Sequence, residues 1–171
     1  EEHDWLRSQQ RLTFARVGRT DPLDLDDYLA SGGYRGLRKA LEIGPAATVR
    51  AVVDSGLRGR GGAGFPAGTK WGFTPQSVWP RYLVVNGDES EPGTYKDRLL
   101  MEYDPHQLIE GILIAALAMD SHKGYLYIRG EYRYIIDKMD AAIEEAYSKG
   151  YLGKNIAGTG FDFDLYTHSG A

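Results

Sequence analysis

The segment from Gly56 to Gly68 has the most unusual composition in the chain, with six glycines in thirteen residues. A glycine inside a helix or strand costs about 0.5–1 kcal/mol relative to alanine, so we expect a loop whose backbone passes close to a ligand. Arg58 and Arg60 add two guanidinium groups, and Lys70 follows shortly after. Backbone N–H groups of such a loop can converge on one anion while nearby cations neutralise its charge. The pattern indicates a site for a phosphate-bearing ligand.

Two aromatic residues flank this loop. Phe65 and Phe73 offer faces on which a flat ring could stack. The glycine spacing from Gly59 to Gly64 matches the dinucleotide fingerprint, but that fingerprint follows a strand and opens a helix. Because residues 46–54 are expected to form a helix, the ordinary Rossmann interpretation of the loop is not favoured. A flexible surface loop is the alternative that composition alone leaves open.

A second polar segment, Asn86–Thr94, follows an expected strand and carries three carboxylates, those of Asp88, Glu89 and Glu91. Ligands of open parallel sheets bind at the carboxyl ends of the strands. These carboxylates would suit Mg²⁺, or hydrogen bonds from ribose hydroxyl and heterocycle N–H groups. The alternative is a solvated turn. The position after a strand favours the ligand site, and we assign no residue as a metal ligand.

The elements that position these loops alternate along the chain. We expect helices within 24–29, 34–43, 46–54, 104–119 and 131–149, and strands at 81–86, 124–129 and 161–166. The order predicts an α/β fold: a Rossmann-like, three-layer domain with a parallel sheet, βαβαβ from about residue 81, and helices on both faces. An N-terminal helical arm, 1–45, and the glycine-rich loop precede it, so we divide the chain into 1–45 and 46–171.

Composition restricts the class of protein. Apolar residues make up 42% of the chain and charged residues 26%, with a formal charge of −4. This balance argues against nucleic-acid binding, and the longest apolar stretch is too short to insert in a membrane. Cysteine is absent, which excludes iron–sulfur ligation within this stretch. There is no initiating Met, and we expect a fragment of a longer chain.

Residues Gly56–Trp71 and Asn86–Arg98 resemble two signature stretches of a known family. This is the NADH- and FMN-binding flavoprotein subunit of respiratory complex I, shared with soluble NAD-linked hydrogenases and formate dehydrogenases. Asp104–His106 and Tyr125–Tyr132 are also similar to that family, so the resemblance extends from about Asp21 onward. It leaves open whether the parent complex is complex I, a hydrogenase or a formate dehydrogenase.

The resemblance implies a diaphorase activity, in which FMN exchanges a hydride with NAD(H) and electrons with iron–sulfur clusters, and no side chain is catalytic. It implies FMN contacts at Gly59, Arg60, Gly61, Lys70, Asn86, Asp88 and Glu89. It implies NADH contacts at Phe65 and Phe73, stacked on the adenine, and at Glu91. A 4Fe–4S cluster is expected in a C-terminal part beyond this sequence, without which the fragment would be inactive.

The implied partners are a thioredoxin-like 2Fe–2S subunit and further iron–sulfur subunits, with a cytoplasmic location on the face of a membrane-bound complex. The competing hypothesis is a non-catalytic nucleotide-binding or assembly module of the same fold.

Overall fold

Four strands form one sheet in the spatial order β1–β2–β4–β3. The structure is a computed structural model that describes residues 4–170. The strands are β1 (Tyr82–Gly87), β2 (Lys123–Ile128), β3 (Gly153–Ile156) and β4 (Phe161–Ser169). The helices are α1 (Asp4–Arg7), α2 (Leu25–Ala30), α3 (Arg35–Ile43), α4 (Pro45–Asp54), α5 (Ala67–Gly72), α6 (Lys96–Tyr103), α7 (Pro105–Met119) and α8 (Arg133–Ser148). The α/β class with a largely parallel sheet is confirmed.

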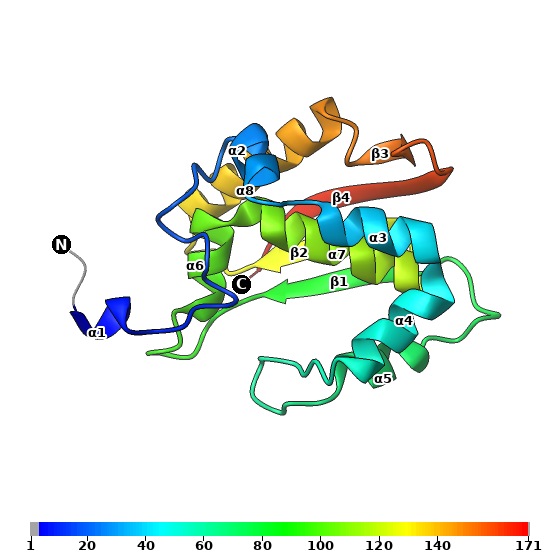
Figure 1. Ribbon diagram of the computed structural model, residues 1–171, viewed down its shortest axis with the longest axis horizontal. Coiled ribbons are helices and arrows are strands. Elements are labelled where there is room, and N and C mark those ends of the chain that lie inside the picture. The colour runs from blue at the N-terminus through cyan, green and yellow to red at the C-terminus, as the bar shows by residue number, and fades with distance from the viewer. Residues whose placement is uncertain (1–3, 171) are drawn as a thin grey trace.

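Helices α7 and α8 cover one face of the sheet, with α3 and α2 packed on them, where the sequence led us to expect helices on both faces (Figure 1). β1, β2 and β4 are parallel, and each crossover steps in the same direction along the sheet. Right-handed crossovers that step in one direction place their helices, here α7 and α8, on the same face. On the other face the side chains of Tyr82, Tyr125 and Tyr166 are 56%, 37% and 46% exposed.

The core lies between the sheet and α7. Helix α7 is apolar around most of its circumference, as a buried helix must be, with Ile109 and Leu113 fully enclosed. Residues of the N-terminal arm enter the same core, among them Leu25 on α2 and Leu37 on α3. The division at residue 45 remains a prediction. No helix within residues 4–170 combines the length and apolarity needed to cross a membrane.

Beyond residue 45, three elements were not expected from the sequence: α5, α6 and β3. Helix α5 packs tightly on α4. The absence of a side chain at Gly68 permits this approach, since a Cβ there would lie 2.6 Å from Val53 Cγ2. The short strand β3 pairs antiparallel with the start of β4, and Ile156 lies opposite Phe161. These elements are four to eight residues long. Such short segments carry too little periodic pattern to be recognised without their tertiary partners.

Candidate functional site

The glycine-rich loop is a closed turn between α4 and α5. The Gly59 N–H donates to the Phe65 carbonyl at 2.9 Å, and Arg58 Nη1 donates to the Gly64 carbonyl at 3.1 Å. Gly62 and Gly64 have φ angles of 116° and 62°, which glycine adopts without the penalty that a Cβ brings. Because a helix precedes the loop, the interpretation against an ordinary Rossmann fingerprint is confirmed.

The acidic loop begins where β1 ends. The Asn86 side-chain oxygen accepts from the Asp88 N–H at 2.9 Å, which turns the chain out of the strand. Glu89 is 5% exposed, and its carboxylate points back into the protein toward α6. Glu91 at the far side of the loop is exposed. Carboxylates close together in the sequence therefore have different environments.

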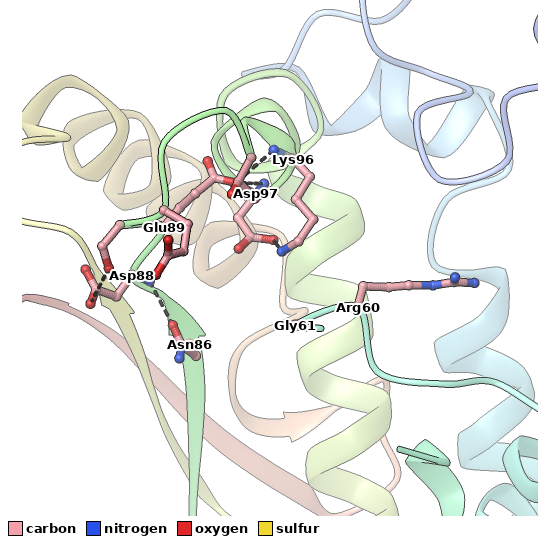
Figure 2. Close-up of a pocket in the computed structure, with 10 residues that line it drawn as sticks. Arg60, Gly61, Asn86, Asp88, Glu89, Lys96 and Asp97 are labelled. Carbon is pink, nitrogen blue, oxygen red and sulfur yellow. Dashed lines mark hydrogen bonds and ion pairs between the residues drawn. The ribbon is translucent and has the colours of Figure 1, made fainter. Parts of the chain in front are cut away.

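The two loops meet around a cavity of about 440 Å³. Its lining residues are Arg60, Gly61, Asn86, Asp88, Glu89, Ser90, Glu91, Thr94, Lys96 and Asp97. Figure 2 shows the Arg60 side chain directed away from Asp88 and Glu89, so the glycine loop borders the cavity mainly through its backbone. The structure thus brings together both predicted loops. It also adds Lys96 and Asp97 to the lining. The sequence did not single out these two residues, because they belong to α6, a helix that was not expected.

This cavity is rich in hydrogen-bond acceptors. Its lining includes four carboxylates and two cationic residues, and Lys96 Nζ is already paired with Asp97 at 2.6 Å. Asp88 Oδ1 is buried and has no hydrogen-bond partner among residues 4–170. A buried carboxylate oxygen without a donor is costly. The lining therefore suits a group that donates hydrogen bonds better than it suits a phosphate group.

A second cavity, of about 560 Å³, lies beside the first and shares Asn86 with it. It is mostly apolar: β1 contributes Leu83 to Val85, and α7 contributes residues such as Leu108 and Ile112. Lys70 borders this cavity and is absent from the lining of the first. Sequence reasoning missed the apolar cavity, because its walls come from a strand edge and a helix that pack together only in the folded chain.

Phe65 and Phe73 lie apart from both cavity linings. Their ring centroids are 6.0 Å apart at an interplanar angle of 52°, and their exposed fractions are 46% and 67%. Two rings that sandwich a third must lie about 7 Å apart, twice the usual carbon–carbon contact distance of about 3.5 Å. The pair would need to open slightly to admit a base, and adenine stacking here remains a prediction.

A parallel sheet with a polar cavity beyond the end of its first strand is the arrangement typical of cofactor-binding α/β domains. The family described as Complex1_51K, Nuo51 FMN-binding domain, matches residues 52–170. The chain belongs to this family.

The most similar proteins include subunits of NADH-quinone oxidoreductases. The chain is 54% identical to an NADH-quinone oxidoreductase subunit of Aquifex aeolicus (strain VF5), over 86% of this chain and 34% of that protein. It is also 54% identical to the protein of the same name from Escherichia coli (strain K12), over 94% of this chain and 37% of that protein. The chain therefore spans about a third of the length of these relatives.

A solved structure confirms the fold. The chain is similar to a chain in the crystal structure of an NAD+-reducing NiFe hydrogenase in the H2-reduced state, with a TM-score of 0.73 and 34% identity. The match covers 95% of this chain and 25% of the hydrogenase chain.

Proposed function

We propose that this chain is the part of an NADH-linked flavoprotein oxidoreductase that binds FMN and receives NADH. The observation that carries the proposal is the polar cavity of about 440 Å³ at the end of a parallel strand, where the glycine loop meets four carboxylates. Membership of the FMN-binding family names the cofactor whose chemistry such a cavity would serve.

The residues present fit FMN, which is an amphipathic molecule. The polar cavity offers carboxylate and amide oxygens to the hydroxyl groups of the ribityl chain and the N–H group of the ring. The adjoining apolar cavity offers a wall to the flat ring, and Lys70 offers an ammonium group to the phosphate. Gly59 and Gly61 allow the loop backbone to come close to the cofactor. When bound, FMN supplies a group that takes up two electrons with a hydride and releases them singly.

The protein's part in the reaction is to hold two rings in register and to control charge around them. Phe65 and Phe73 are proposed to hold the adenine of NADH, and Glu91 to accept hydrogen bonds from the adenosine ribose. Exchange of electrons with iron–sulfur clusters belongs to the same proposal, with a 4Fe–4S cluster bound by residues outside the 171 of this chain. None of these steps needs a nucleophilic side chain.

The names of the relatives support a place in a multi-subunit enzyme, because they are subunits of an NADH-quinone oxidoreductase. We propose a thioredoxin-like 2Fe–2S subunit as the direct partner, with further iron–sulfur subunits beyond it. A cytoplasmic location, on the face of a membrane-bound complex, follows from the same assignment.

The test uses the full-length protein purified without oxygen. It should carry a yellow flavin that NADH bleaches, and Asp88→Ala should lower the bound FMN because it removes a carboxylate from the cavity lining. Asp137→Ala is the matched control, since Asp137 is exposed and its ion pair is with Arg133 on the same helix. A colourless protein that binds nucleotide without bleaching would instead support a non-catalytic nucleotide-binding module.

A further inference from the structure

Glu89 lies in the lining of the polar cavity, yet its carboxylate is engaged elsewhere. Oε1 accepts from the Lys96 N–H at 2.8 Å and the Asp97 N–H at 2.9 Å, and Oε2 accepts from the Arg98 N–H at 3.2 Å. These are N–H groups of the first turn of α6, which a helix cannot satisfy internally. Glu89 therefore caps α6 from a distance of seven residues or more along the chain.

The residue that directly precedes α6 cannot take this role. Tyr95 occupies the N-cap position with a left-handed backbone, φ 49°, and makes no side-chain capping bond. A left-handed tyrosine is strained and persists only where surrounding contacts enforce it. The Arg98 guanidinium lies over the Tyr95 ring at 4.3 Å. The start of α6 thus depends on Glu89 for its hydrogen bonds.

The backbone of Glu89 is held from the opposite side, by the turn between β2 and α8. Its carbonyl oxygen accepts from Arg129 Nη1 at 3.3 Å and from the Tyr132 hydroxyl at 3.4 Å. Arg129 is itself fixed by two bonds to the Glu131 carboxylate, at 2.9 and 3.0 Å. Such bidentate pairs restrict the guanidinium to one geometry. The acidic loop is therefore tied at one residue to two separate elements.

We propose that Glu89, Arg129 and Tyr132 form a clamp that positions the acidic loop for cofactor binding without contacting the cofactor through their side chains. The clamp holds Glu89 next to Asp88, which lines the cavity, and fixes the first turn of α6, which carries Lys96 and Asp97. Arg129 and Tyr132 are absent from the cavity lining. They act as positioning residues, and this inference rests on the proposed FMN site.

The experiment compares variants of the full-length protein. Arg129→Ala should weaken binding of FMN to the apo-protein about tenfold, the effect of one charge-assisted hydrogen bond. Arg129→Lys should recover part of this loss, because an ammonium group can still donate to the Glu89 carbonyl. Tyr132→Phe, which removes a single hydroxyl, should weaken binding by about threefold. Arg133→Ala is the matched control: it removes the same charge from an exposed side chain four residues along the chain, whose ion pair is with Asp137 on its own helix.

A second measurement reads the loop itself. In the apo-protein, amide hydrogen exchange across residues 88–98 should become about tenfold faster in Arg129→Ala, while exchange in α7 stays unchanged. Equal FMN affinity and equal exchange in Arg129→Ala and the parent protein would overturn the clamp. If Arg129→Ala does not fold, unchanged affinity and exchange in Tyr132→Phe would overturn it instead. A parent protein that binds no FMN contradicts the proposed function, and hydrogen exchange then still decides whether the clamp exists.

Discussion

Gly61 borders the polar cavity with open space around it. A Cβ at this position would meet no protein atom within 4 Å, and Gly61 is not among the glycines with positive φ. Gly61→Val should therefore leave the stability of the apo-protein nearly unchanged while its side chain occupies space beside the cofactor. We expect bound FMN to fall at least about tenfold, the equivalent of about 1.4 kcal/mol, measured by flavin absorbance after gel filtration.

Gly72→Val is the control for this substitution, because Gly72 also has open space and lines neither cavity. Normal flavin content in Gly61→Val would contradict a close approach of the loop to the cofactor. A large fall in the melting temperature of its apo-form would show that the glycine serves the loop structure instead.

Glu91 is the exposed carboxylate of the cavity lining and is the proposed selector of NADH over NADPH. A carboxylate near the ribose accepts from its hydroxyl groups but repels a 2′-phosphate, so Glu91→Lys should move the ratio of kcat/KM values toward NADPH by about tenfold or more. Steady-state kinetics with both cofactors measures the ratio. Glu42→Lys makes the same change of charge at a residue outside both cavity linings and should leave the ratio unchanged. An unchanged ratio in Glu91→Lys would place the ribose elsewhere.

At the scale of elements, Glu110 of α7 joins the N-terminal arm to the core. Its carboxylate accepts from the Tyr34 N–H at 2.7 Å, from the Leu37 N–H at 3.0 Å and from the Tyr28 hydroxyl. Burial raises the pKa of the Tyr28 hydroxyl well above its usual value, and the hydrogen bond to Glu110 raises it further. One carboxylate thus orders the start of α3 and holds α2 against α7.

Glu110→Ala should lower the free energy of unfolding by about 2–4 kcal/mol, since each buried donor left unpaired costs about 1–3 kcal/mol. Urea unfolding followed by circular dichroism measures this change. Glu42→Ala is the control, because Glu42 is largely exposed and its ion pair is with Lys39 on the same helix. A loss below about 0.5 kcal/mol in Glu110→Ala would mean that water replaces the carboxylate at little cost.

At the scale of the whole molecule, His106 links α7 to α8 inside the protein. His106 is 1% exposed, and its Nε2 lies 3.0 Å from Glu145 Oε2. Burial lowers the pKa of His106, although the hydrogen bond to Glu145 and the charges of Glu145 and Asp24 oppose this shift. The folded protein therefore favours the neutral ring, while the unfolded chain binds a proton at about pH 6.5.

Because the pKa of His106 is lower in the folded state, its contribution to stability is complete above about pH 6.5 and is lost as the pH falls below that value. His106→Gln should reduce the fall in unfolding free energy between about pH 6.5 and about pH 5. Burial raises the pKa of Asp104 despite its ion pair with Arg16. This raised pKa has the opposite effect on the pH dependence of stability, but it is present in the parent protein and in the variant alike. An identical pH dependence in parent and variant would contradict the buried neutral ring. His168→Gln, at an exposed residue of β4, is the control.

The sequence by itself determined the α/β class and the two loops that carry the candidate site. These features depend on local chemistry: a run of glycines cannot continue a helix, and a buried strand followed by a polar loop can be recognised within a short stretch of chain. The long helix α7 and strands β1, β2 and β4 were predictable for the same reason. The resemblance to the flavoprotein family rests on the same two loops, and the match over residues 52–170 confirms it.

Tertiary structure alone decided which side chains face a ligand and which face of the sheet is covered. Arg60 points away from the acidic loop, Lys70 borders a second cavity, and the Glu89 carboxylate is occupied by α6. Each of these outcomes depends on how side chains and elements pack in the folded chain, about which local propensity carries no information. The bare tyrosine face has the same origin, since it follows from the order in which the strands pair.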